Sequence, residues 1–161
     1  MTVNDLAACL RQEIELAAGI VHTLDEQQQA LLRLDLAGLE ASVPALEKLT
    51  DELRQAEERR EATARALAEE HELDGTTPLR ELLAVLPAPV GRELEQAGRR
   101  LGSLIEEIRH RNHANYVLML NAARFNRAIL QFVAGTTATY APDGVRGEAG
   151  EARSLILNKE A

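Results

Sequence analysis

The stretch from Pro89 to Ala134 constrains the fold more than any other part of this chain, because it carries one helical pattern without an internal proline. At 1.5 Å per residue, about 46 helical residues would extend ~69 Å. A compact globule of 161 residues has a radius of gyration of roughly 15 Å and a diameter near ~40 Å. The helix does not fit inside such a globule. The sequence therefore predicts a rod of packed helices, an architecture that usually binds other chains.

The residue types elsewhere in the chain also favour helices. Aromatic residues make up 2% of the sequence, β-branched runs are few, and Ala, Leu, Glu, Gln and Arg dominate. These residues lose little side-chain entropy in a helix. We expect an all-α fold, an elongated antiparallel helical bundle or coiled coil of three long helices plus one short helix, with a flexible C-terminal tail.

Capping residues and prolines predict where the first two helices begin and end. Asn4 or Asp5 is expected to cap a first helix that runs to about Arg33, and Asp35 to cap a second. Pro44 should kink the second helix or restart it, with Ser42 as the new cap. The expected core positions of the second helix are Leu39, Val43, Leu46, Thr50, Leu53, Arg60, Ala64 and Leu67.

Glycine and proline also divide the second half of the chain. Asp74-Gly75 should end the second helix, and Thr77-Pro78 should open a short third one. Gly135 is expected to end the last helix, which gives a bundle domain at 1–135 and a tail at 136–161. The expected core positions of the last helix are Leu94, Leu101, Ile105, Ile108, Met119, Ala122, Ile129 and Val133.

Charge and cysteine content exclude several classes of function. A net charge of −8 argues against nucleic acid as a partner, because phosphate binding needs a concentrated basic surface. Cys9 is the one cysteine, so a reducing compartment is the default. The N-terminal sequence lacks the pattern of a signal peptide, and no apolar run approaches the ~20 residues that span a bilayer. We expect a cytoplasmic protein without stable membrane insertion.

Apolar residues surround the last helix near Tyr116 to Leu120, where five consecutive positions cover its whole circumference. Val117 and Leu120 point away from the expected core positions, and Phe125 and Phe132 lie on their flank. Such a segment is either covered by the other helices or exposed for a partner. Both alternatives stay open at this point.

Three asparagines, Asn112, Asn115 and Asn126, fall on the apolar face of the same helix. Polar residues at such positions cost stability unless they are paired, yet they fix the register between helices. Internal hydrogen bonds that align the bundle are the favoured interpretation, and a polar contact for an incoming helix is the alternative.

No constellation of residues indicates catalysis, a metal site or a cofactor. Glu107-x-x-His110 has the spacing of di-iron bundles, but those sites need a second copy and further inward-facing glutamates. Cys9 lacks a nearby basic partner that could activate it. Gly98 and Gly102, four residues apart, form a notch of small residues that could permit close helix contact, a weak indication in an aqueous protein.

The order and spacing of several elements resemble the FlgN family of flagellar export chaperones, over nearly the whole chain. The matching elements are the leucine-rich first helix, the Asp35-capped second helix with Lys48 and Arg59-Arg60, the Asn112-x-x-Asn115-x-x-Leu118 segment, and the tail Tyr140-Ala141-Pro142-Asp143-Gly144.

The resemblance implies a cytosolic type III secretion chaperone that binds hook–filament junction proteins, masks their amphipathic terminal segments and delivers them to the flagellar export apparatus. An amphipathic client helix would dock on surplus apolar surface. We expect its contacts at Val117, Leu120, Phe125, Ile129 and Phe132, and the resemblance implies a role for Tyr140 in docking at the export apparatus. The alternative is a coiled-coil adaptor that self-associates without an export client, and a homodimer is compatible with either.

Overall fold

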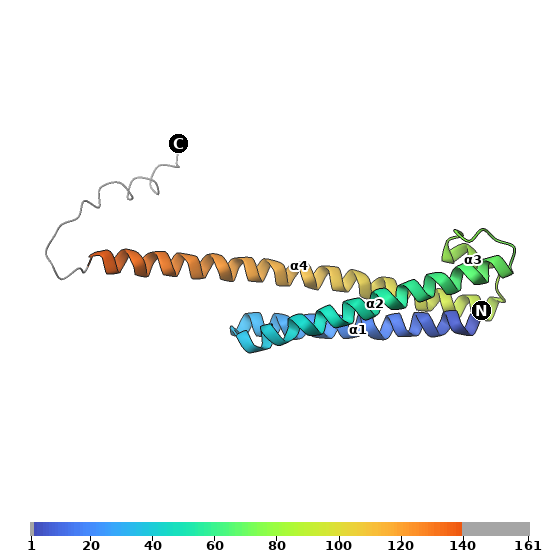
Figure 1. Ribbon diagram of the computed structural model, residues 1–161, viewed down its shortest axis with the longest axis horizontal. Helices are drawn as coiled ribbons and strands as arrows, with labels where there is room; N and C mark the ends of the chain where they lie inside the picture. Colours follow the sequence, from blue (N-terminus) through green and yellow to red (C-terminus); the bar gives the residue numbers. More distant parts are fainter. Residues whose placement is uncertain (1, 140–161) are drawn as a thin grey trace, which may run out of the picture. The chain divides into compact units, whose positions relative to one another are not determined.

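The computed structural model describes the backbone of residues 2–139 and the side chains of residues 2–134. Over these residues the chain forms four helices and no strand: α1 (Val3–Arg33), α2 (Leu36–Glu70), α3 (Leu79–Val85) and α4 (Ala88–Thr139) (Figure 1). The predicted all-α helical bundle of three long helices and one short helix is confirmed. Residues up to Leu120, which include the first part of α4, form one compact unit, and residues from Asn121 belong to a second.

The first helix begins with a capping box at Thr2 and Asp5. The Thr2 hydroxyl accepts a hydrogen bond from the Asp5 backbone N–H at 3.3 Å, and the Asp5 carboxylate accepts one from the Thr2 N–H at 2.7 Å. Each side chain therefore satisfies a donor that the helix leaves unpaired. The prediction of Asn4 or Asp5 as the cap is wrong, because Asp5 lies inside the first turn and supports the cap from there.

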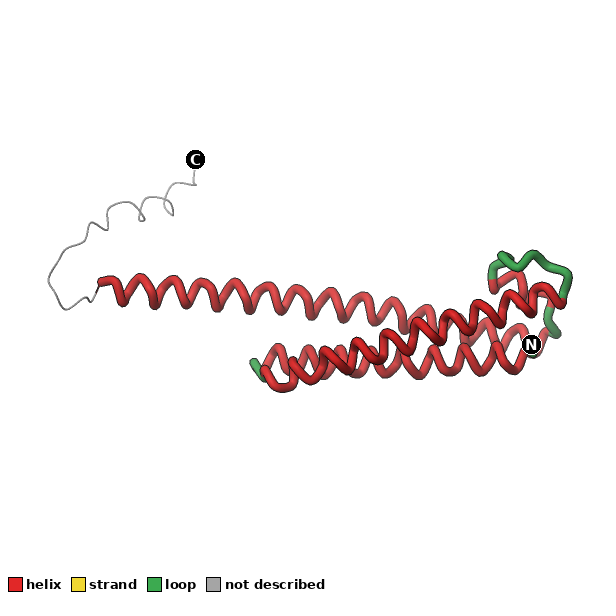
Figure 2. Tube along the Cα trace, viewed as in Figure 1, coloured by secondary structure: helices red, strands yellow, loops and turns green. Residues whose placement is uncertain are grey.

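A short turn joins α1 to α2 (Figure 2). Leu34 adopts the left-handed conformation with φ 57°, and the Asp35 N–H donates to the Ala30 carbonyl at 2.9 Å, which closes the end of α1. Asp35 then caps α2, because its Oδ1 accepts a hydrogen bond from the Gly38 N–H at 3.1 Å. The predicted Asp35 cap is confirmed.

The second helix runs through Pro44 without a break. Ser42 does not cap a new helix, because its hydroxyl donates to the Leu39 carbonyl at 2.7 Å and accepts from Gln27 at 3.1 Å. The prediction of a restart at Ser42 is therefore wrong. The buried side of the helix, packed against α1, holds the chain helical across a proline that removes one backbone donor.

The second helix ends at Glu70, earlier than Asp74-Gly75 predicts. Glu72 takes the left-handed conformation with φ 59°, and the Leu73 N–H donates to the Ala68 carbonyl at 2.9 Å. Glu72 therefore occupies the position that glycine usually takes in this motif. Asp74 instead organises the following turn, where its Oδ1 accepts from the Thr76 N–H at 2.8 Å.

Two glycines mark the last part of the described chain. Gly91, near the start of α4, passes so close to α3 that an added Cβ would lie 2.7 Å from the Leu83 carbonyl oxygen. Gly135 was expected to end α4, but the helix continues to Thr139. A glycine inside a helix costs only about 1 kcal/mol relative to alanine, which is not enough by itself to stop it.

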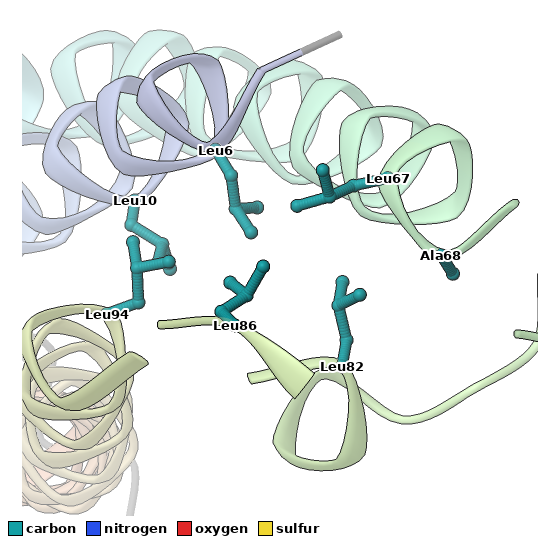
Figure 3. Packing of buried hydrophobic residues seen from close by; sticks show 7 residues of the cluster. All are labelled: Leu6, Leu10, Leu67, Ala68, Leu82, Leu86 and Leu94. Atoms are coloured by element: carbon teal, nitrogen blue, oxygen red, sulfur yellow. The ribbon is translucent and has the colours of Figure 1, made fainter. Parts of the chain in front are cut away.

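The core of the first unit lies where all four helices meet (Figure 3). Leucines from residues 6–10, 67 and 82–94 point toward one another there, and α3 supplies Leu82 to cover this end of the bundle. The buried members of the cluster are Leu6, Leu10, Leu67, Ala68, Leu82, Leu86 and Leu94.

Pairs of contacts give the relative directions of the three long helices within this unit. Glu13 contacts Arg60 and Gln27 contacts Ser42, so α2 runs antiparallel to α1. Leu94 packs in the cluster with Leu6, whereas Asn115 contacts Gln27, so α4 runs parallel to α1.

The side of α2 that packs inward differs from the prediction. Val43 and Thr50 were expected in the core and are exposed, while Ser42, Ala56 and Thr63 are buried. Small and hydroxyl-bearing residues thus occupy buried positions of α2, and at one of them Ser42 is buried while the adjacent Val43 is exposed. In α4, Met119 is exposed and its neighbour Leu118 is half-buried.

Candidate docking surface

A regular heptad runs along α4 within the first unit. The side chains that recur at spacings of three and four residues are buried or half-buried, as expected for one face of a helix packed on neighbours. These positions are Leu94, Ala97, Leu101, Leu104, Ile108, Arg111, Asn115 and Leu118. The heptad therefore includes two polar residues, Arg111 and Asn115, near the end of this unit.

Asn115 forms the centre of a buried polar layer that joins three helices. Its side chain is fully buried, and its Nδ2 donates to the Leu24 carbonyl at 2.9 Å and to Gln27 Oε1 at 3.0 Å. Gln27 Nε2 in turn donates to the Ser42 hydroxyl at 3.1 Å. The amide oxygen of Asn115 has no hydrogen-bond partner among the described residues. This layer links α4 to α1 and α1 to α2 by directional bonds.

Arg111 forms an ion-pair network one turn before this layer. It contacts Asp25 of α1 and lies 2.6 Å from Glu107 on its own helix. Its side chain is half-buried, which makes these pairs less exposed to screening than ordinary surface pairs. The Glu107 carboxylate of the Glu-x-x-His pattern is thus engaged by an arginine, and His110 is exposed.

A second buried ion pair lies between α1 and α2. Arg60 Nε donates to both carboxylate oxygens of Glu13, at 2.9 and 3.1 Å. Both residues occupy heptad positions that would ordinarily hold leucine. Burial raises the pKa of the Glu13 carboxyl above its ordinary value, and the Arg60 guanidinium opposes this shift only in part.

The expected contact residues of α4 are exposed in both units. Val117 and Leu120 are exposed within the first unit. In the second unit Phe125 is 67% exposed, Ile129 44% and Phe132 73%. Tyr140 lies outside the described residues.

The heptad of α4 continues through the second unit without a change of spacing. After Leu118 it passes through Ala122 to Phe125, Ile129 and Phe132. Leu118 and Ala122 are half-buried, whereas the large side chains of Phe125, Ile129 and Phe132 are exposed. Large apolar residues at core spacing that are left in solvent form a candidate interaction surface.

Of the three predicted asparagines, the structure places Asn115 in the interior and leaves Asn112 and Asn126 exposed. Asn112 and Asn126 do not belong to the buried heptad of α4 that contains Leu118. The prediction used a different set of core positions, which contained Met119 instead of Leu118. Arg60 and Asn115 were predicted at inward-facing positions, but their partners Glu13 and Gln27 were not predicted. A strict heptad count that also accepts polar residues would have found them.

The described residues contain no group of three or more His, Cys, Asp or Glu placed to hold a metal ion. Cys9 is half-buried, with its Sγ 4.0 Å from the Thr63 hydroxyl. Among the described helices, none combines the length and apolarity needed to cross a bilayer.

A helical bundle with a buried polar layer and an exposed apolar heptad is an architecture compatible with the binding of another helix. The chain belongs to the FlgN family, whose model, described as FlgN protein, matches residues 1–148. This is a family of flagellar export chaperones that bind flagellar hook-associated proteins, and it is not known for enzymatic activity. No curated protein and no solved structure matches the chain significantly.

Proposed function

We propose that this protein is a cytosolic chaperone that binds hook–filament junction proteins and masks their amphipathic terminal segments until it delivers them to the flagellar export apparatus. One observation carries the proposal. The heptad that forms the core of the first unit continues through Phe125, Ile129 and Phe132, where it is exposed. Family membership supplies the class of client.

An amphipathic helix of the client would supply the apolar face that this part of α4 lacks. Such helices dock through anchors spaced at i, i+3, i+4 and i+7, which matches the spacing of Phe125, Ile129 and Phe132. We assign client contact to these three residues and to Val117 and Leu120. We assign Tyr140 to docking at the export apparatus, on the basis of the tail motif that it shares with the family.

The contribution of the two phenylalanines can be bounded from their exposure. Complete burial of such a side chain stabilises by about 1.5–3 kcal/mol. Because roughly two thirds of Phe125 and Phe132 remains to be covered, the pair should contribute about 2–4 kcal/mol to binding, which corresponds to at least about a 30-fold change in Kd.

The test is the double substitution Phe125→Ala/Phe132→Ala, with calorimetric titration of a junction-protein C-terminal segment. We expect at least about a 30-fold weaker Kd and little change in melting temperature, because both side chains are already in solvent. Leu32→Ala/Leu36→Ala is a matched control, since these leucines are equally exposed in the first unit. A loss of stability with unchanged client affinity would show that the phenylalanines are core residues.

The exposed heptad also fits a second copy of the chain, which is the basis of the alternative function, a self-associating adaptor. Light scattering with and without the client segment separates the two functions. A chaperone forms a defined complex when the segment is added. A permanent oligomer that ignores the segment would support the adaptor and contradict the chaperone.

A further inference from the structure

An apolar groove lies in the first unit, formed by α3 and the first turns of α4. It has a volume of about 820 Å³ and is open to solvent. Its apolar lining includes Leu79 and Leu83 of α3 and Gly98 of α4. Space above Gly98 is free, because an added Cβ would meet nothing within 4 Å. The groove therefore has a floor that a partner side chain can reach.

Arginines line this groove in a chain that is strongly acidic as a whole. Arg80, Arg92 and Arg99 contribute to it, while the protein carries a net charge of −8. Glu95 also lines the groove, but it already pairs with Arg99 at 2.7 Å. Arg80 and Arg92 are exposed and form no ion pair with any described residue, so they carry the uncompensated positive charge.

We propose that this groove binds an amphipathic helix of a partner protein whose apolar stripe is flanked by acidic residues. A groove between two helices is the usual receptor for a third helix. The apolar lining would take the stripe, and Arg80 and Arg92 would pair with the flanking carboxylates. A lipid surface fits less well, because recognition of anionic lipid takes clusters of four to eight basic residues. This site is separate from the client-binding residues of α4.

Two designed peptides test the chemistry of the occupant on the full-length chain. Both carry the same leucine stripe at helical spacing, and their flanking positions are Glu in one and Lys in the other. We expect the Glu peptide to bind at least about tenfold more tightly than the Lys peptide, because two unpaired arginines attract the one and repel the other. Arg80→Glu/Arg92→Glu should weaken the Glu peptide about fivefold or more.

Gly98 and Gly102 provide a matched pair of substitutions for the groove itself. A Cβ at either position meets nothing within 4 Å, but only Gly98 lines the groove. Gly98→Leu should fill the floor and weaken the Glu peptide at least about tenfold, whereas Gly102→Leu should change its Kd by less than about twofold. Circular dichroism confirms that both variants stay helical. Neither variant should alter the affinity for the junction-protein segment.

Several outcomes would overturn the proposal. The proposal is wrong if the two peptides bind equally well or if neither binds at millimolar concentration. It is also wrong if Gly98→Leu and Gly102→Leu weaken the affinity for the Glu peptide equally. Preference for anionic vesicles over the Glu peptide would assign the groove to lipid instead. A dimer that Gly98→Leu abolishes in the absence of peptide would assign it to a second copy of the chain.

Discussion

The buried ion pair between Glu13 and Arg60 offers the sharpest test of the packing between α1 and α2. The Glu13 side chain is 2% exposed and that of Arg60 is 18% exposed. Removal of one partner of a buried pair typically costs about 3–5 kcal/mol, because it leaves the other charge without compensation. Arg60→Leu should cost the most, since the remaining carboxylate is the more deeply buried group. Glu13→Leu should cost about 2–3 kcal/mol, because the Arg60 guanidinium can still reach water.

The double variant Glu13→Leu/Arg60→Leu should behave differently. Both positions belong to the heptads of their helices, so two leucines would extend the apolar core without leaving a charge behind. Replacement of a buried pair by well-packed apolar residues is often neutral or stabilising. We expect the double variant to unfold within about 1 kcal/mol of the wild type, or to be more stable, which gives a large coupling energy in the cycle.

Urea unfolding followed by circular dichroism gives the free energy of unfolding of the wild type, the two single variants and the double variant. Equal m values show that all four proteins expose a similar surface on unfolding.

The pH dependence of these free energies provides a second test. Because the folded pKa of Glu13 is raised, protonation favours the folded state, and this contribution is lost as pH rises through the raised value. The cost of Arg60→Leu should therefore shrink as the pH falls toward the ordinary carboxyl pKa. Additive costs in the cycle, or a cost that grows on acidification, would refute the reasoning.

Three further changes test local features. Asn115→Ala should destabilise the protein by about 2–3 kcal/mol in urea unfolding, because it empties a fully buried site and removes two hydrogen bonds. Asn112→Ala, at an exposed position, should stay within about 0.5 kcal/mol. Pro44→Ala should raise the free energy of unfolding by about 1–3 kcal/mol, because it restores a backbone donor inside α2. Glu72→Gly should raise the melting temperature slightly, through relief of about 1 kcal/mol of strain at its positive φ.

The helical class and the start of α2 followed from local signals. Helix-forming residues dominate the sequence, and Asp35 followed by Gly38 provides both a carboxylate acceptor and a backbone donor in the first turn. Helix ends were less predictable because several residues compete at each. Glu72 adopts a left-handed conformation although Gly75 lies three residues later, and the Leu73 N–H closes the helix on the Ala68 carbonyl while Leu73 itself packs against the core.

Which face of each helix is buried was harder to predict than the helices themselves. Val43 is more apolar than Ser42, yet Ser42 faces inward, where its hydroxyl accepts a hydrogen bond from Gln27. Such a preference depends on a partner from another helix, which apolar periodicity in one helix does not reveal. The exposed surface was predicted only as one of two alternatives. A helix that is apolar on many sides is either buried on several sides or exposed for a partner, and the sequence left both alternatives open for Phe125 and Phe132, which the structure leaves exposed.

The polar layer and the exposed heptad are two consequences of one repeat in α4. Apolar heptad positions occur on both sides of Asn115, so hydrophobic burial alone would allow α1 to pack at more than one register. Only one register brings Asn115 to Gln27 and Arg111 to Asp25. A shift by one heptad would set Gln27 against Ile108 or Ala122 and leave several buried polar groups unpaired, at about 1–3 kcal/mol each. We infer that these polar contacts decide which part of the repeat becomes core, and thereby leave Phe125, Ile129 and Phe132 exposed.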